Sequence, residues 1–286
     1  MEIKKSDGLQ QLRQRLDGID QALLDLVAQR QQLVGEIGRF KRQRGRHLRD
    51  FEREAQVLAL AEQRGAALGL EGHLCRQLMS LLIEYSLESQ ELGQLSHRAQ
   101  GQGQRALVIG GLGRMGRWFS DFLDIQGYEV CIADQTIDAS SPYLSTQDWP
   151  AWVHEVDLIV VAVPMAACQK VFDKLAELKP RATIFDLGSL KSPLAAGLKQ
   201  LAQQQLAVTS VHPLFGPDTS MLSGKHVVVL DLGHAAALQQ ARRLFENTMA
   251  DVVTLSVDDH DSLMAYVLSC THLMNIAFAK VLADSG

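Results

Sequence analysis

Apolar residues in the first third of the chain recur every three or four positions, which is the period of an amphipathic helix. The pattern predicts one helix of about ten turns over 7–44, a second over 51–67 and a third over 72–94. No proline precedes Pro142, so nothing in this part interrupts long helices. The first helix is too long for a compact monomer, and we therefore expect a helical bundle that a second chain completes.

Beyond a polar, glycine-rich segment at 93–103, short β-branched runs alternate with helical stretches. Strands separated by helices indicate βαβ units and a parallel sheet covered on both faces. A final helix is expected from 260 to 283. The predicted strands are 105–109, 128–133, 158–163, 183–187, 208–211, 227–230 and 252–255.

Composition narrows the class of protein. The 28 Lys and Arg against 33 Asp and Glu give a net charge of -5, whereas a chain that binds nucleic acid needs a basic excess. The four cysteines are dispersed, which predicts neither a disulfide framework nor a metal site. No signal-like stretch and no run of about 18 apolar residues occurs. We therefore expect a cytoplasmic protein without a membrane, nucleic-acid or metal partner.

A glycine-rich loop follows the first predicted strand. Residues Gly111–Gly116 match G-x-G-x-x-G, in which Gly111 permits a tight turn, Gly113 lets backbone approach a pyrophosphate and Gly116 lets helix pack on strand. Asp134 ends the second strand, where a carboxylate bonds the ribose 2′-hydroxyl and repels a 2′-phosphate. The alternative is a glycine-rich turn in a nucleotide-free domain. The motif favours NAD over NADP, bound by Gly111, Leu112, Gly113, Arg114, Met115, Gly116 and Asp134.

These features predict an all-α helical domain at 1–92, a linker at 93–103 and an α/β Rossmann dinucleotide-binding domain at 104–256. The remaining 257–286 would begin a C-terminal helical domain.

Ligands of such sheets bind beyond the carboxyl ends of the strands, which directs attention to two segments there. Ser189 and Lys191 follow one strand, and His212 ends the next, where two prolines and a glycine follow it and hold it in place. A histidine held there could act as a general base near neutral pH. The plainer interpretation is a hydrogen-bonded loop histidine, and Lys191 is either an anion contact or a solvated charge. His260 has the plainer interpretation of a helix N-terminal residue.

Three cations, Arg13, Arg30 and Lys41, fall on one face of the first helix, which is more often a solvated stripe. Other polar groups continue the row at ligand-like spacing, namely Asp50, Arg53, Glu54, Ser86 and Gln90. At about 1.5 Å per residue, Arg13 lies about 25 Å from Arg30, too far for one small ligand. The row makes sense if Arg13 reaches into a partner subunit, and it suits a small dianion.

The same positions resemble the all-helical chorismate mutases of the AroQ type. The resemblance implies a Claisen rearrangement of chorismate to prephenate, which needs only a compact conformer and stabilised charge on the ether oxygen. It implies that Arg13, Arg30 and Arg53 hold the two carboxylates and that Lys41 and Gln90 contact the ether oxygen. Asp50, Glu54 and Ser86 would hold the hydroxyl side or support the other residues.

The second part resembles prephenate dehydrogenase in the glycine loop, in 186–191, in 211–218 and in 259–261. Together the two parts resemble the bifunctional T-proteins of tyrosine biosynthesis. The resemblance implies that prephenate and NAD give 4-hydroxyphenylpyruvate, carbon dioxide and NADH. It makes His212 the catalytic base and Ser189 the residue that positions it, with substrate contacts from His260 and Lys191. It also implies a homodimer and feedback inhibition by L-tyrosine.

Family members continue for several tens of residues beyond the position of Gly286, with a substrate-binding arginine in that part. We therefore expect a truncated chain with mutase activity and weak or absent dehydrogenase activity.

Two other functions remain open. One is a dehydrogenase of arogenate or another small acid whose helices serve as an oligomerisation arm, and the other is a catalytically inactive dinucleotide-binding or tyrosine-sensing regulator.

Overall fold

The computed structural model describes residues 3–44 and 48–284, with two compact units. The helical unit is Met1–Gln94 and the sheet unit is Leu95–Gly286. No helix within the described residues is both long and apolar enough to cross a membrane.

Three helices build the helical unit, as the periodicity predicts. They are α1 (Ile3–Gln43), α2 (Phe51–Ala67) and α3 (Gly72–His97). With 41 residues, α1 is about 60 Å long. The buried apolar residue of α1 is Val34, in its C-terminal half, whereas the leucines of its N-terminal half are exposed. Only part of the apolar stripe of α1 is therefore covered within one chain.

An eight-stranded sheet with the order β3-β2-β1-β4-β5-β6-β7-β8 forms the centre of the sheet unit. The strands are β1 (Arg105–Ile109), β2 (Glu129–Ala133), β3 (Leu144–Thr146), β4 (Leu158–Val161), β5 (Thr183–Asp186), β6 (Val208–Pro213), β7 (His226–Leu230) and β8 (Asp251–Leu255). The helices are α4 (Arg114–Ile125), α5 (Met165–Leu178), α6 (Ala195–Gln203), α7 (Ala235–Glu246) and α8 (Val257–Asp284), with 3-10 turns η1 (Trp149–Trp152) and η2 (Ser192–Leu194).

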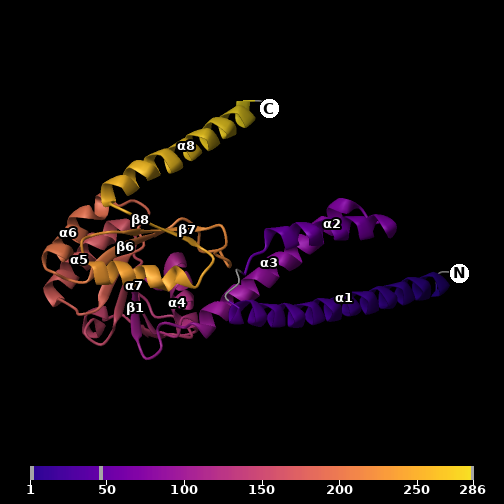
Figure 1. The fold of residues 1–286 in the computed structure, drawn as a ribbon, viewed down its shortest axis with the longest axis horizontal. Coiled ribbons are helices and arrows are strands. Elements are labelled where there is room, and N and C mark those ends of the chain that lie inside the picture. Colours follow the sequence, from indigo (N-terminus) through magenta and orange to yellow (C-terminus); the bar gives the residue numbers. More distant parts are fainter. Residues whose placement is uncertain (1–2, 45–47, 285–286) are drawn as a thin grey trace. The chain divides into compact units, whose positions relative to one another are not determined.

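Alternate residues of the strands pack on opposite faces of this sheet. In β1, Leu107 and Ile109 lie in the core with α5 and α6, whereas Ala106 and Val108 lie in the core with α4 and α7. Figure 1 shows these helices around the strands. The sheet is therefore buried on both faces, which explains why its strands are almost uniformly apolar.

Three details differ from the sequence prediction. The edge strand β3 was not predicted, because three residues give too short a pattern. β7 runs antiparallel to β6, since no helix among the described residues connects them and a parallel return needs a crossover. The third helix continues to His97, beyond its predicted end at 94 and into the expected linker at 93–103, and Leu95 in its last turn is buried in the core of the sheet unit.

The last helix, α8, contacts the sheet through its first turns and then extends away from it (Figure 1). His260 and Met264 are buried, whereas the apolar side chains further along are exposed. Its first turn therefore belongs to the core of the sheet unit.

Candidate active sites

Arg30 and Ser86 form the central contact between α1 and α3. The Arg30 Nη1 donates to Ser86 Oγ at 2.5 Å and to the carbonyl oxygen of Leu82 at 2.9 Å. Partial burial lowers the pKa of the Arg30 guanidinium, which stays charged at neutral pH. Arg30 and Ser86 are thus two predicted mutase-site residues on different helices that form a direct hydrogen bond.

Gln90 lies one turn beyond Ser86 and is also buried. A Cβ at Gly38 would lie 3.0 Å from Gln90 Cγ, so glycine at this position of α1 leaves the space that Gln90 fills. Within the described residues, Gln90 Oε1 and both amide atoms of Gln31 are buried without a hydrogen-bond partner. Unsatisfied buried amides are costly, which makes Gln90 and Gln31 candidates for contact with a ligand or a partner group. The sequence analysis missed Gln31, a polar residue on the face of α1 that also carries Gly38.

The start of α2 holds its acids in local contacts. Asp50 caps the helix, because its carboxylate accepts a hydrogen bond from the Arg53 backbone N–H at 3.0 Å. Glu54 pairs with Arg49, with 3.1 Å between Oε1 and Nε. Lys41 donates to the carbonyl oxygen of Leu48, just before the cap. Asp50 and Glu54 therefore have structural partners already, and Lys41 is bonded to the segment just before them.

Two predicted arginines stand apart from this contact. Arg13 is exposed in the N-terminal half of α1, about 25 Å along the helix from Arg30. Arg53 is exposed, and its guanidinium reaches only Gln56, at 3.4 Å, among the described contacts. A single helical unit therefore does not gather all three arginines at one place.

The glycine loop connects β1 to α4 as predicted, with one correction. The positive φ of 86° falls at Gly110, whereas Gly111, to which the sequence assigned the tight turn, lies against Ile132 without positive φ. A side chain at Gly116 would collide with the carbonyl oxygen of Gly110, which confirms close packing of helix on strand. Gly113 is the N-cap of α4 and is exposed, so its backbone is open to a ligand.

Asp134 lies beside this loop at the end of β2. Its Oδ2 accepts a hydrogen bond from the Leu112 backbone N–H at 3.0 Å. Arg114, at the start of α4, pairs with Asp218 at 2.7 Å, although both side chains are exposed. Met115 packs against the core on the α4 face. The Asp218 contact joins the glycine loop to the segment that follows β6.

A fully buried ion pair lies at the carboxyl ends of β5 and β6. The Lys191 ammonium is 0% exposed and donates to Asp186 Oδ2 at 2.8 Å and to the Val211 carbonyl oxygen at 3.0 Å. Asp186 also accepts from Ser210 Oγ at 2.5 Å and from the Gly188 N–H at 2.8 Å. Burial lowers the pKa of Lys191, and the Asp186 carboxylate opposes that shift. Lys191 was predicted to contact substrate, but its ammonium points inward and fixes the loop after β5.

Next to this pair, His212 of β6 contacts the first turn of α8. His212 Nδ1 lies 2.8 Å from His260 Nε2, and His260 Nδ1 lies 2.8 Å from Asp261 Oδ1. Burial lowers the pKa of His212 to about 4, with contributions from Lys191 and from His260. His212 is therefore a neutral imidazole at physiological pH. His260 was predicted to contact substrate, but both of its ring nitrogens bond within the protein.

Ser189 is exposed in the loop after β5. Within the described part of the chain, no hydrogen bond joins it to His212, which it was predicted to position. Asp261 and Ser210 were not singled out by sequence, although Asp261 directly follows His260.

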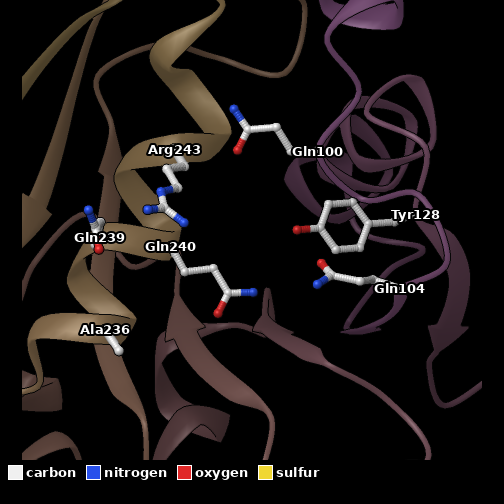
Figure 2. A pocket seen from close by; sticks show the side chains of 7 residues that line it. All are labelled: Gln100, Gln104, Tyr128, Ala236, Gln239, Gln240 and Arg243. Atoms are coloured by element: carbon white, nitrogen blue, oxygen red, sulfur yellow. The ribbon is translucent and has the colours of Figure 1, made fainter.

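A pocket of about 340 Å³ lies elsewhere on the sheet unit (Figure 2). Its lining residues are Gln100, Gln104, Tyr128, Ala236, Gln239, Gln240 and Arg243. Gln104 and Tyr128 directly precede β1 and β2, so the pocket opens at the amino ends of these strands, whereas dinucleotides bind at carboxyl ends. We therefore place the candidate site at the glycine loop and His212. Among residues 3–44 and 48–284, no group of three His, Cys, Asp or Glu side chains could hold a metal ion.

Both halves of the chain match known families. Residues 12–91 match the family described as chorismate mutase type II, and residues 134–254 match the nucleotide-binding domain of prephenate dehydrogenase. The fold, the Arg30–Ser86 site and the site at the glycine loop and His212 thus define a bifunctional enzyme, in which a mutase domain precedes a nucleotide-binding dehydrogenase domain.

Relatives of nearly full coverage combine the same two parts. The chain is 30% identical over 279 residues to the T-protein of Enterobacter agglomerans. This alignment covers 96% of this chain and 71% of that protein. It is 25% identical to the T-protein of Haemophilus influenzae, over 95% of this chain and 69% of that protein. The chain belongs to the T-protein family, which confirms the resemblance found by sequence.

A solved structure establishes the same fold for the sheet unit. It is a prephenate dehydrogenase from Aquifex aeolicus in complex with hydroxyphenyl propionate and NAD+, with a TM-score of 0.51 and 21% identity. The likeness covers 63% of this chain and 70% of that chain.

Proposed function

We propose that this chain catalyses two consecutive steps of tyrosine biosynthesis. The helical unit converts chorismate to prephenate, and the sheet unit converts prephenate and NAD to 4-hydroxyphenylpyruvate, carbon dioxide and NADH. The observation that carries the proposal is the pairing of two different sites in one chain. Arg30 is bonded into α3 within the mutase match, and His212 is buried and neutral within the dehydrogenase match.

The rearrangement of chorismate requires no proton transfer, so the helical unit needs only to hold a compact conformer and stabilise charge. Arg30, together with Arg53 and the Arg13 of a second copy, binds the two carboxylates through charge-assisted hydrogen bonds. Lys41 and the Nε2 of Gln90 donate to the ether oxygen.

The remaining polar residues of the helical unit support this arrangement. Ser86 accepts the Arg30 hydrogen bond and donates to the Leu82 carbonyl oxygen, so it fixes the guanidinium on α3. Asp50 holds the start of α2 as its cap, and Glu54 faces Arg49 nearby. These acids lie on the hydroxyl side of the bound substrate.

A second copy of the chain supplies the distant arginine. The face of α1 around Arg13 is apolar and exposed, and Leu12, Leu16, Ile19, Leu23 and Leu26 each expose about half or more of their surface. Covering this stripe with the same stripe of another chain buries it and carries Arg13 toward the partner's Arg30.

Mixing two inactive variants tests this homodimer. Arg13→Ala and Arg30→Ala chains are each inactive as homodimers, but a mixed dimer regains one site that has both arginines. Random exchange makes half of the dimers mixed, so about one quarter of wild-type mutase activity returns. No recovery after subunit exchange, verified with differently tagged chains, would refute the crossed site.

The glycine loop and Asp134 fit an NAD dinucleotide. Gly113 leaves its backbone open at the start of α4, where N–H groups and the helix dipole favour a pyrophosphate. The Asp134 carboxylate, already fixed by the Leu112 N–H, accepts a hydrogen bond from a ribose 2′-hydroxyl and repels a 2′-phosphate. NAD, when bound, takes up the hydride from the substrate ring.

His212 is the general base of the second reaction. Its neutral imidazole accepts the proton of the ring hydroxyl as charge shifts in the ring, and breaking the bond to the ring carboxylate makes the ring aromatic. Ser189, exposed beside the buried ion pair, contacts the substrate or the nicotinamide region.

One incubation tests both activities. The purified chain is mixed with chorismate and NAD, and the products are separated by chromatography while NADH is followed by absorbance. The matches to both families lead us to expect 4-hydroxyphenylpyruvate with a stoichiometric amount of NADH, whereas prephenate without NADH would support the sequence-based expectation of weak or absent dehydrogenase activity. Arg30→Ala should abolish formation of 4-hydroxyphenylpyruvate from chorismate but not from prephenate. His212→Asn should stop the reaction at prephenate. Unchanged chorismate would support helices that act only as an oligomerisation arm, and NAD binding without any turnover would support a regulator.

Two finer points belong to the same proposal. L-tyrosine, which resembles the product, inhibits the dehydrogenase, and a titration of NADH formation with tyrosine tests this. The proposal includes a cytoplasmic location, which the four dispersed and unpaired cysteines support. Thiol counting in protein alkylated inside cells should find all four thiols reduced.

A further inference from the structure

Asp261, His260 and His212 form a continuous hydrogen-bonded chain, called the relay below. The relay has two links of 2.8 Å, one between Asp261 and His260 and one between His260 and His212. His260 is 0% exposed and His212 is 5% exposed, so water does not replace either partner. The two elements that meet here, β6 and α8, are far apart in sequence.

Asp261 is fixed as a carboxylate by four donors. Its Oδ1 accepts from the Lys191 N–H at 3.1 Å and from His260, and its Oδ2 accepts from the Ser192 N–H at 2.6 Å and from the Ser192 hydroxyl. Burial raises the pKa of Asp261, but the hydrogen bonds from Ser192, His260 and Lys191 outweigh it and hold the pKa below its ordinary value. An ionised carboxylate only accepts hydrogen bonds.

Proton accounting along the relay then determines the state of the base. Because Asp261 only accepts, a His260 ring that carries a single proton must hold it on Nδ1, and its Nε2 is then an acceptor. His212 therefore donates from Nδ1, which leaves its Nε2 with a free lone pair. We propose that Asp261 and His260 are positioning residues that fix His212 in the tautomer with its proton on Nδ1. This inference rests on the proposed dehydrogenase function.

The fixed tautomer suits the reaction. His212 Nε2 accepts the proton of the ring hydroxyl while the hydride leaves the same ring carbon for the nicotinamide. The bond to the ring carboxylate then breaks, its electron pair completes the aromatic ring, and carbon dioxide departs. His212 Nε2 returns the proton to the phenolic oxygen, so the base is regenerated. With the opposite tautomer, Nε2 would carry a proton and could not accept one.

Replacing Asp261 by Asn reverses this order. The Asn oxygen keeps the shorter of the two backbone hydrogen bonds, from the Ser192 N–H at 2.6 Å, and gives up the longer one from the Lys191 N–H at 3.1 Å. Its NH2 group then faces His260 and makes His260 Nδ1 an acceptor. His260 Nε2 then donates to His212, and His212 Nε2 becomes protonated. We expect Asp261→Asn to lower kcat for prephenate by about 100- to 1000-fold, with KM changed less than about threefold. Asp258→Asn, at an exposed acid of the same helical turn, should change kcat less than about twofold.

A second variant separates the relay from mere anchoring of the 191–192 backbone. His260→Gln keeps an amide oxygen that accepts from His212 Nδ1 without help from a carboxylate, so kcat should fall less than about tenfold. In this background Asp261→Asn should add less than about threefold, because the relay is already interrupted. An equal loss from Asp261→Asn in both backgrounds would overturn the proposal and leave Asp261 as a structural anchor.

Nitrogen-15 NMR of labelled histidine gives a readout that needs no turnover. Between pH 6 and 8, the wild-type chain should show His212 with a proton on Nδ1 and none on Nε2. The titratable groups that face the His212 ring are Lys191, Asp186, His260 and Asp261. Asp261→Asn should exchange these signals, and unchanged signals would overturn the relay. If wild-type protein lacks prephenate turnover but shows this tautomer, the proposed function fails while the relay stands. If turnover is normal and the tautomer is reversed, only the relay fails.

Discussion

Replacing Lys191 by Met tests whether the buried ion pair supports the sheet unit. The ammonium and the Asp186 carboxylate are both 0% exposed and 2.8 Å apart. Methionine fills a similar volume, but it leaves the carboxylate with only the Ser210 hydroxyl and the Gly188 N–H as donors. Removing one partner of a buried pair leaves an uncompensated charge and costs about 3–5 kcal/mol. We expect a loss of this size in the free energy of unfolding.

Tryptophan fluorescence in urea measures the sheet unit alone. The three tryptophans of the chain, Trp118, Trp149 and Trp152, all lie in the sheet unit. With a slope of about 2 kcal/mol per molar urea, the loss moves the unfolding midpoint down by about 2 M. As a matched control, Lys174→Met removes an exposed partner of Glu177 and should cost less than about 1 kcal/mol.

The double variant Asp186→Asn with Lys191→Met isolates the cause. An amide at position 186 carries no charge. Its oxygen still accepts from the Gly188 N–H, and its NH2 group donates to Ser210 Oγ, so it should recover most of the lost stability. If Lys191→Met shifts the midpoint no further than Lys174→Met, the argument from an uncompensated buried charge is wrong. If the double variant recovers nothing, packing rather than charge explains the loss.

Four further measurements test other sites. Arg30→Ala should lower mutase kcat/KM by at least about 100-fold in a chorismate assay, while prephenate oxidation is unchanged. Asp134→Asn should weaken the preference for NAD over NADP by about tenfold, measured as the ratio of kcat/KM values. Because burial lowers the pKa of His212 to about 4, the unfolded chain alone binds this proton between pH 6.5 and 4. Stability should therefore fall by up to about 3 kcal/mol as pH falls through that window, and His212→Asn should lack this component in urea titrations. Burial raises the pKa of Cys131 to about 11, so iodoacetamide at pH 8 should label exposed Cys270 and spare Cys131 in a mass spectrum.

The repeat of apolar positions was enough to predict the three helices and most strands. The period of apolar positions depends only on neighbouring residues. It indicates whether a segment is a helix or a strand, but not which segments pack against it. That is why the edge strand β3, with three residues, was missed and why β7 was expected to be parallel. The direction of β7 relative to β6 depends on the connection from Pro213 to His226. No local sequence pattern revealed that this connection has no helix.

Site residues divide in the same way. The positions of the glycine loop and of His212 at strand ends could be predicted, because a motif at a strand end fixes the position of the backbone. The inward turn of Lys191 could not, since a four-carbon side chain reaches either solvent or core with the same sequence. Likewise His260 bonds to His212 only because the first turn of α8 packs on β6, a contact between residues far apart in sequence.

The two candidate sites also differ in what one chain can complete. In the sheet unit, Lys191 and His260 already have partners at every polar atom near the base, so this site is organised before substrate binds. In the helical unit, the buried amides of Gln31 and Gln90 have atoms without partners among the described residues, and Arg13 is exposed far along α1. Under the proposed homodimer, a second copy supplies these missing groups, so dilution that separates the subunits should abolish mutase activity before it unfolds either unit.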